Sequence, residues 1–395
     1  MSELIELHKK NSANMGERNG IAVPLNFGDA EAAYTALRGH VSVADYSHYT
    51  KIKIDGEEAF DFLDFAVAGD VAEIRDEQAL HTVILDENGD ILSDVYVLND
   101  DDTYLLLCEY INDADMLALL NARKGEFEVE IESLTASHAM ITYEGPYSWE
   151  LMAEIYGMDV IGIPYLGFIA MENDSYVLRA GKHGEYGYKI ILPHGEAVEL
   201  WEKALELGEK YEMKQVGLDL QKIGRLENPY FNPEGAAKVS RKPRDLQLQW
   251  MVRYDKEEFF GRDGLLSARE EPATRKVVGL VAQKEGESEA LAIGDKIVCA
   301  GEEIGEVVNA GYSAALKKYI AQGFIKAEFA YAGLDDYSVQ TSGGAAVAVE
   351  TSATPFFMNL SMLVNPNEHS FVNPQKPKNL IEQLQQAETA EAVEA

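Results

Sequence analysis

The segment "ALHTVILDENGDILSDVYVLNDDDTYLLLC", residues 79–108, decides the fold class of this sequence. It contains three runs of apolar, β-branched and aromatic residues, separated by polar turns at Asn88-Gly89 and at residues 99–102. Asn-Gly between two such runs is a strong hairpin signal, so the runs are expected to form neighbouring antiparallel strands. The segment therefore predicts a β-meander.

A carboxylate lies in the middle of the second predicted strand. Because successive side chains of a strand point to opposite faces, Asp94 shares its face with Leu92 and Tyr96. The opposite face is the better core face and carries four residues: Ile91, Ser93, Val95 and Val97. Asp94 is then expected to point either into water or into a cavity. A buried carboxylate is unfavourable unless it is paired, so this residue has a structural partner or a function.

The chain on both sides of this segment alternates between predicted strands and predicted helices, after a polar lead at the N-terminus. Strand-like stretches occupy residues 41–56, 127–133 and 138–146. Apolar residues recur at helical spacing in residues 57–67, 112–125, 195–212 and 218–227. Strands and helices that alternate in antiparallel blocks predict an α+β fold.

The composition and the hydrophobic periodicity of the sequence change near residues 267–276, which are charged, contain a proline and lack periodicity. Short strands separated by glycines follow, as in a small β-barrel. We therefore expect a core of two interleaved α+β subdomains in residues 1–268 and a C-terminal β-barrel in residues 275–365. Residues 366–395 are expected to form an acidic tail that is loosely helical or disordered.

The formal net charge is −34, with 68 acidic and 34 basic residues. This excess disfavours nucleic acid and anionic membranes as partners, because both require clustered lysine and arginine. No apolar run reaches the roughly 18 residues that span a bilayer, and no secretory signal is recognisable. Cys108 and Cys299 lie far apart, so no disulfide framework is expected and a cytoplasmic location is favoured.

Metal and nucleotide motifs are not recognisable in the sequence. The eight histidines are scattered without a histidine or cysteine partner at metal-ligand spacing, so no metal site is expected. The glycine-rich stretch "GKHGEYG", residues 181–187, has the spacing G-x-x-G-x-x-G and not that of a dinucleotide fingerprint. We interpret it as a hairpin loop.

Several blocks, taken together and in order, resemble a known family. The blocks are residues 43–63, 68–97, 143–146 ("YEGP"), 178–193 ("LRAGKHGEYGYKIILP"), 216–227 ("VGLDLQKIGRLE") and 248–265. With the C-terminal β module, they resemble the aminomethyltransferase family, which comprises the T-protein of the glycine cleavage system and its folate-dependent demethylase relatives. The resemblance covers about residues 15–365.

The resemblance implies a three-domain cloverleaf around a central cavity that holds tetrahydrofolate. In this family a one-carbon group passes to N5 of the folate. The donor is a small methylated molecule or an aminomethyl group on a lipoylated carrier protein. The family's functional aspartate matches Asp94, which is therefore the expected catalytic residue and would lie in the cavity.

The resemblance also suggests which residues bind the cofactor. The candidates are Tyr96, Glu109, Glu185, Tyr188, Lys189, Gln221, Arg225 and Trp250. Two of them depart from the family: Lys189 replaces a glutamate that binds the pterin, and Gln221 replaces an arginine. A lysine ammonium group can only donate hydrogen bonds, so Lys189 cannot take the role of that glutamate. Glu185 or Glu109 could approach the pterin instead.

The departures leave two alternatives open. The first is an enzyme or binding protein on the same fold that no longer uses folate, in which Lys189 meets an anionic substrate. The second is a folate-binding scaffold without transferase activity, as in relatives that assist iron–sulfur assembly. Those relatives carry a cysteine in the glycine-rich block, whereas residues 181–187 contain none.

Overall fold

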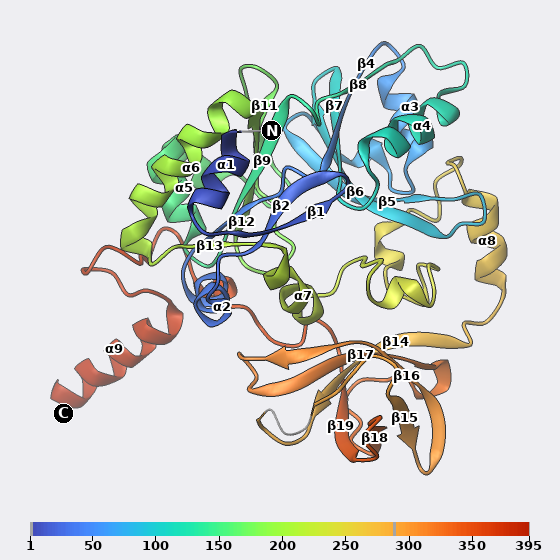
Figure 1. Cartoon of the computed structure of the whole chain (residues 1–395), viewed down its shortest axis with the longest axis vertical. Helices are drawn as coiled ribbons and strands as arrows, with labels where there is room; N and C mark the ends of the chain where they lie inside the picture. The colour runs from blue at the N-terminus through green and yellow to red at the C-terminus, as the bar shows by residue number, and fades with distance from the viewer. Residues whose placement is uncertain (1–2, 287–289, 395) are drawn as a thin grey trace.

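The computed structural model describes residues 3–286 and 290–394, with side chains described as far as residue 387. It contains two large open sheets with helices on their outer faces, a two-stranded hairpin and a closed β-barrel (Figure 1). This arrangement confirms the predicted α+β class and the C-terminal barrel. Within the described ranges, no helix is long and apolar enough to cross a membrane.

The first sheet has six strands in the order β10-β11-β12-β9-β3-β13, and only β13 runs parallel to its neighbour β3. Its strands are β3 (Ser42–Asp45), β9 (His138–Glu144), β10 (Phe168–Met171), β11 (Ser175–Leu178), β12 (Gly187–Pro193) and β13 (Lys214–Val216). Its helices are α1 (Glu3–Lys10), α5 (Ser148–Tyr156) and α6 (His194–Gly208). The core between sheet and helices centres on Trp201, as the apolar stripe of α6 predicts.

The second sheet has five antiparallel strands in the order β5-β6-β7-β4-β8. Its strands are β4 (Thr50–Asp55), β5 (Gln78–Leu85), β6 (Ile91–Asp100), β7 (Thr103–Cys108) and β8 (Glu130–Ser133). Helices α3 (Ala59–Ala66) and α4 (Asp113–Lys124) cover one face. Strand β6 pairs with β5 on one side and β7 on the other, so the predicted meander is confirmed.

Both faces of β6 are buried, which explains where its carboxylate goes. Val95 and Val97 pack beneath the helices of the second sheet. Tyr96 packs on the other face, in a cluster that also contains Met140 on β9 of the first sheet and Tyr46 directly after β3. Asp94 therefore points into the region between the two sheets and not into water, which answers the question left open by the strand pattern.

The closed barrel has the strand order β14-β17-β16-β15-β18-β19. Its strands are β14 (Arg275–Ala282), β15 (Lys296–Cys299), β16 (Glu302–Ser313), β17 (Lys318–Lys326), β18 (Tyr337–Gln340) and β19 (Ala346–Ser352). Helix α8 (Arg262–Glu270) precedes the barrel. Helix α7 (Leu218–Glu227) lies between the sheets and the barrel and contacts β2 (Ile21–Asn26), β16 and β17 (Figure 1).

The N-terminal segment is more structured than its polar sequence predicts. It forms α1, a hairpin of β1 (Asn14–Arg18) with β2 (Ile21–Asn26), and α2 (Ala30–Gly39). The carboxylate of Asp29 caps α2 by accepting a hydrogen bond from the Ala32 amide at 2.9 Å. The hairpin and α2 both pack near α7, so this segment forms part of the centre of the molecule.

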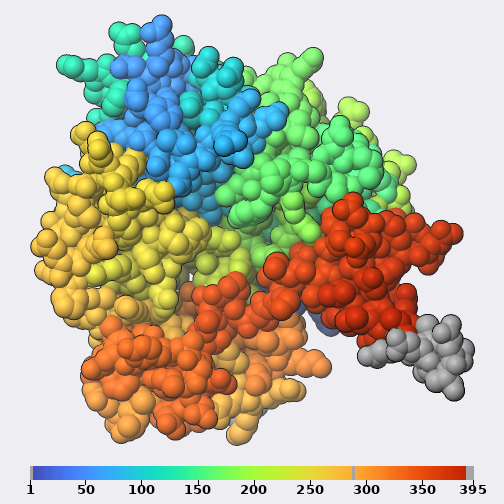
Figure 2. All heavy atoms as spheres, turned by 180° about the vertical axis from the view of Figure 1, so that it is seen from behind, coloured from blue at the N-terminus to red at the C-terminus, as the bar shows by residue number. Residues whose placement is uncertain are grey.

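The C-terminal segment returns from the barrel to the first sheet. The Phe371 amide donates to Glu150 on α5 at 2.8 Å, and the Phe371 ring packs against Tyr147. In Figure 2 the red segment that precedes helix α9 lies beside the green region of the first sheet and its helices. Helix α9 (Leu380–Glu394) then extends away from the body of the molecule (Figure 1). Short 3-10 helices complete the fold at Val71–Glu73, Met158–Gly162, Glu209–Tyr211, Ala236–Lys238, Gln249–Met251, Ala327–Phe329 and Leu360–Leu363.

Candidate active site

Asp94 is the centre of a buried polar cluster between the two sheets. Its Oδ2 lies 2.8 Å from His81 Nε2 on the neighbouring strand β5 and 2.7 Å from Lys182 Nζ. Its Oδ1 has no hydrogen-bond partner among the described residues. The residue is 1% exposed, so this free oxygen is a buried acceptor.

A second carboxylate, Glu109, follows the end of β7 and shares Lys182 with Asp94. Glu109 Oε2 lies 3.1 Å from Lys182 Nζ and accepts a hydrogen bond of 2.7 Å from the Tyr49 hydroxyl. Its Oε1 lies 2.6 Å from Nη1 of Arg225, which comes from α7. Two carboxylates and two cations thus alternate through the centre of the site.

Aromatic rings enclose Lys182. Its Nζ lies 5.7 Å from the ring centre of Tyr49, 5.8 Å from that of Tyr96 and 5.6 Å from that of Tyr110. The negative face of an aromatic ring attracts an ammonium group at such distances. Lys182 is 2% exposed, so its charge is neutralised inside the protein and not by water.

The charges of the site follow from burial and pairing. Burial alone would raise the pKa of Asp94, but the Lys182 ammonium and the hydrogen bond from His81 hold that pKa below its ordinary value. For Glu109, Arg225 and Lys182 overcome burial in the same way and hold the pKa well below its ordinary value. Burial lowers the pKa of His81 despite the adjacent carboxylate, so a neutral imidazole donates to Asp94 from Nε2.

Lys189 and Glu144 lie at the edge of this cluster. Lys189 Nζ donates to the Ala180 carbonyl at 2.7 Å, and burial lowers the pKa of Lys189 to about 8. Glu144, at the end of β9, pairs through Oε2 with Nδ1 of His183, whereas its Oε1 has no partner in the part of the chain that the structure describes. Burial opposes ionisation, but His183 and Lys189 hold the pKa of Glu144 at about 2.

Helix α7 contributes donors that remain unused. Gln221 and Arg225 are four residues apart and therefore lie on one face of the helix. Gln221 Nε2 and Arg225 Nε and Nη2 are buried without a partner in the described ranges. Both residues line a cavity of about 320 Å³, together with Tyr110. Unused buried donors beside a cavity indicate a ligand site.

Trp250 lies on the other side of the cluster. Its ring centre is 6.2 Å from that of His81 and 6.3 Å from that of Tyr230, with edge-to-face geometry in both pairs. Trp250 is 59% exposed and lines, with Tyr230, a cavity of about 420 Å³ against the barrel. The His81 ring is stacked on Tyr96 at 4.2 Å, which connects this cavity to Asp94 through aromatic contacts.

The structure does not bring two of the expected cofactor residues to this cluster. Glu185 is turned to Arg38 Nη1, at 3.2 Å from Oε1, and to Ser361, whose hydroxyl lies 2.6 Å from Oε2. Tyr188 packs in the core around Trp201. The other six, Tyr96, Glu109, Lys189, Gln221, Arg225 and Trp250, lie in or beside the cluster.

Four members of the cluster are not among the site residues predicted from the sequence: His81, Glu144, Lys182 and His183. The available signal is the position of Lys182 and His183 in the glycine-rich block, whose spacing by itself indicates a hairpin loop. His81 carried a weaker signal, since it faces Tyr96 in the meander register. Its contact with Asp94 follows only from the diagonal neighbours of that register.

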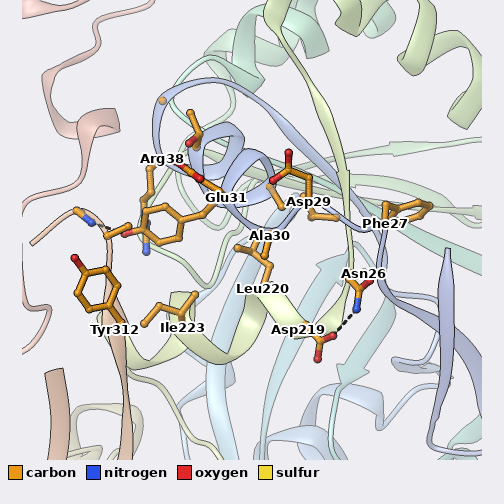
Figure 3. A pocket seen from close by; sticks show the side chains of 18 of the residues that line it. Asn26, Phe27, Asp29, Ala30, Glu31, Arg38, Asp219, Leu220, Ile223 and Tyr312 are labelled. Carbon is orange, nitrogen blue, oxygen red and sulfur yellow. Dashed lines mark hydrogen bonds between the residues drawn. The ribbon is translucent and has the colours of Figure 1, made fainter. Parts of the chain in front are cut away.

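A larger pocket lies elsewhere. It has a volume of about 900 Å³ and is bordered by β2, α2, α7 and the end of β16 (Figure 3). Leu220 and Ile223 line it from a different face of α7 than the face that carries Gln221 and Arg225. None of the residues paired with Asp94 lines this pocket, so its size does not make it the reacting site.

Comparisons with known proteins agree with the fold described above. Residues 4–256 match the family model described as GCVT N-terminal domain, and residues 275–357 match that of the Glycine cleavage T-protein C-terminal barrel domain. The aminomethyltransferase of Thermoanaerobacter sp. (strain X514) is 30% identical over 339 residues, covering 84% of this chain and 90% of that protein. The aminomethyltransferase of Thermotoga maritima is 27% identical, covering 90% and 96%.

A solved structure shows the same arrangement. The crystal structure of glycine cleavage system aminomethyltransferase T from Bartonella henselae matches with a TM-score of 0.78 at 25% sequence identity. The match covers 90% of this chain and 97% of that chain. The similarity therefore extends over both open sheets and the barrel and is not limited to one part of the fold.

Proposed function

Because the chain belongs to the aminomethyltransferase family and is an enzyme of the T-protein type, we propose that it transfers a one-carbon group to tetrahydrofolate, with Asp94 at the reacting end of the site. The state of the Asp94 carboxylate carries this proposal. Its Oδ2 is fixed by His81 and Lys182, whereas Oδ1 is buried without a partner among the described residues. Such an oriented acceptor is suited to hold or move a proton at a reacting nitrogen.

The unpaired hydrogen-bond donors and acceptors of the site match those of a folate. A pterin ring presents hydrogen-bond donors on its guanidine-like edge and a carbonyl acceptor beside them. The buried atoms that lack partners in the described chain include two acceptors, Asp94 Oδ1 and Glu144 Oε1, and donors on Gln221 and Arg225. Lys189 supplies no acceptor, so Glu144 is the carboxylate that would hold the donor edge.

The surroundings of Asp94 also fit a flat heteroaromatic ligand. The Tyr96 ring is stacked with His81, and Tyr230 and Trp250 extend this set of rings towards the cavity of about 420 Å³. Apolar rings with a few oriented polar groups are the usual composition of a cofactor pocket. When bound, tetrahydrofolate supplies the nitrogen that receives the one-carbon group.

Two donors are compatible with this proposal: an aminomethyl group on a lipoylated carrier protein, or a small methylated molecule. The names of the relatives, and the glycine cleavage system of the Bartonella protein, support the carrier. The two donors leave different products. Methylenetetrahydrofolate formed with the carrier identifies aminomethyl transfer, and methyltetrahydrofolate formed from small donors identifies a demethylase.

A titration of the purified protein with tetrahydrofolate tests the proposal. We expect wild type to bind, and Asp94→Asn to retain binding while its turnover falls about 100-fold or more, which is the usual contribution of a positioned acid or base. Failure of wild type to bind would exclude folate as the cofactor. Unchanged turnover in Asp94→Asn would remove this residue from the reaction.

A second candidate is a protein on the same fold that binds an anionic ligand without folate. It is favoured by Lys189, which is buried with its Nζ on a carbonyl and forms no ion pair with a described residue. Under this alternative, wild type shows no folate binding, and Lys189→Met abolishes binding of a small carboxylate such as acetate. Folate binding that survives Lys189→Met would favour the first proposal.

A further inference from the structure

Lys182 is enclosed by groups that would bind a free cation. The ammonium group lies within 3.1 Å of two carboxylates, Asp94 and Glu109, and within 5.8 Å of the ring centres of Tyr49, Tyr96 and Tyr110. Carboxylates provide the opposite charge, and ring faces attract an ammonium ion without requiring a fixed hydrogen-bond direction. We call these five residues the cation cage.

The backbone holds Lys182 in this cage from both sides. The next residue, His183, pairs with Glu144, and its carbonyl accepts a hydrogen bond of 2.6 Å from Arg38. Gly184 has φ +83°, and a Cβ at Gly187 would come within 2.6 Å of the Gly181 Cα, so both positions require glycine. The glycine-rich block is thus tightly folded, and it points Lys182 inward.

We propose that Lys182 is a built-in cation, which fills the cation cage at Asp94 so that the reaction centre excludes a positively charged ligand group and admits a neutral or anionic one. The inference rests on the proposed function only in treating Asp94 as the reacting end. The cage itself is defined by the contacts of Lys182.

The charges around the cage support this selectivity. Asp94 and Glu109 are already balanced by Lys182 and Arg225. A second positive group at Asp94 would approach the Lys182 ammonium without an additional carboxylate in contact to compensate it. The atoms left without partners on α7 are donors on Gln221 and Arg225, and these favour an oxygen-bearing ligand.

Removal of the Lys182 side chain tests the cage. Lys182→Ala leaves a space that matches a short alkylammonium ion, bordered by the same carboxylates and rings. We expect ethylammonium chloride to raise the melting temperature of Lys182→Ala by several degrees relative to equal sodium chloride, because a ligand that binds only the folded state stabilises it. Wild type should show no such difference.

Matched variants show whether the effect belongs to the cage. Lys189→Ala also removes a buried lysine beside Tyr96, but Lys189 contacts a carbonyl and not the two carboxylates, so ethylammonium should not stabilise it. The double variant Lys182→Ala with Asp94→Asn should lose most of the response. Tetramethylammonium should bind Lys182→Ala more tightly than wild type by calorimetry.

These outcomes separate the inference from the proposed function. A folded Lys182→Ala that binds neither ion would overturn the cation cage, even if tetrahydrofolate binding is intact. Binding of both ions by Lys182→Ala, combined with no folate binding by wild type, would support the cage and remove the proposed function. Wild type that binds tetramethylammonium as tightly as Lys182→Ala would overturn the exclusion of cations.

A double-mutant cycle covers the case in which Lys182→Ala does not fold. Lys182→Met keeps most of the side-chain volume without the charge, and it should be destabilised because two carboxylates lose their cation. Adding Asp94→Asn should then restore part of the lost melting temperature. Additive losses in the cycle would show that Lys182 and Asp94 are not coupled and would overturn the proposal.

Discussion

Arg225 on α7 and Glu109 at the end of β7 form a buried ion pair, with 2.6 Å between Nη1 and Oε1. The pair connects the second sheet to a helix that also contacts the barrel strands β16 and β17. One contact therefore links two parts of the fold and one side of the Asp94 cluster. The same arginine keeps Nε and Nη2 available, with no partner in the described part of the chain.

Breaking this pair from one side should destabilise the protein strongly. Arg225→Met removes one of the two cations paired with the buried Glu109 and leaves Lys182 as the other. The removal of one partner of a buried pair typically lowers the free energy of unfolding by about 3–5 kcal/mol. The double variant Glu109→Gln with Arg225→Met should lose less than the sum of the two single variants. Urea unfolding measures all three, and additive losses would contradict the coupling.

The Glu144–His183 pair should give the protein an acid-sensitive contribution to stability. The folded-state pKa of Glu144, about 2, lies below its ordinary value of 4.5, so its contribution is complete above about pH 4.5 and is lost as the pH falls towards 2. A shift of this size corresponds to about 3 kcal/mol. Unfolding free energies of wild type and Glu144→Gln should converge over this range. Parallel curves would show that Glu144 is not stabilised by its pairing.

The sequence was sufficient to predict the elements whose stability is local. Asn88-Gly89 and the alternation around Asp94 specify β5, β6 and β7, and the apolar stripe around Trp201 specifies α6. The polar N-terminal segment was not predicted as α1 to α2, because those helices are stabilised by packing against α6 and α7 and not by a strong pattern of their own.

The partners of Asp94 could not be predicted because they come together only in three dimensions. The sequence predicts β3 and β4 as consecutive strands, but they belong to different sheets. The space between those sheets contains the site. Lys182 reaches Asp94 across 88 residues of sequence from a block whose glycines first indicate a turn. Hydrophobic periodicity predicts secondary structure and cannot predict a contact between residues this far apart in the sequence.

Variants of Glu185 and Gln221 should distinguish a residue that stabilises the fold from one that binds the ligand. Glu185→Gln weakens the buried contact with Arg38, which keeps Glu227 as a partner, so we expect a loss of about 2 kcal/mol in unfolding free energy with unchanged folate affinity. Gln221→Ala removes an amide nitrogen that no described residue uses, so we expect a loss of only about 1 kcal/mol and a clear loss of folate affinity. Calorimetric titration and urea unfolding of both variants measure the two effects, and the reverse pattern would assign Glu185 to the ligand.

Trp250 should report directly on ligand binding. It is 59% exposed and contacts His81, whereas Trp149 and Trp201 are buried in the core around the first sheet. A ligand that enters beside Asp94 should therefore change the fluorescence of Trp250 selectively. Trp250→Phe should abolish most of the fluorescence change on titration with tetrahydrofolate and alter the free energy of unfolding by less than about 0.5 kcal/mol, as is usual for exposed positions.

Trp201→Phe is the matched control and should leave the fluorescence change intact. A full response in Trp250→Phe would place the ligand away from the His81 side of the site.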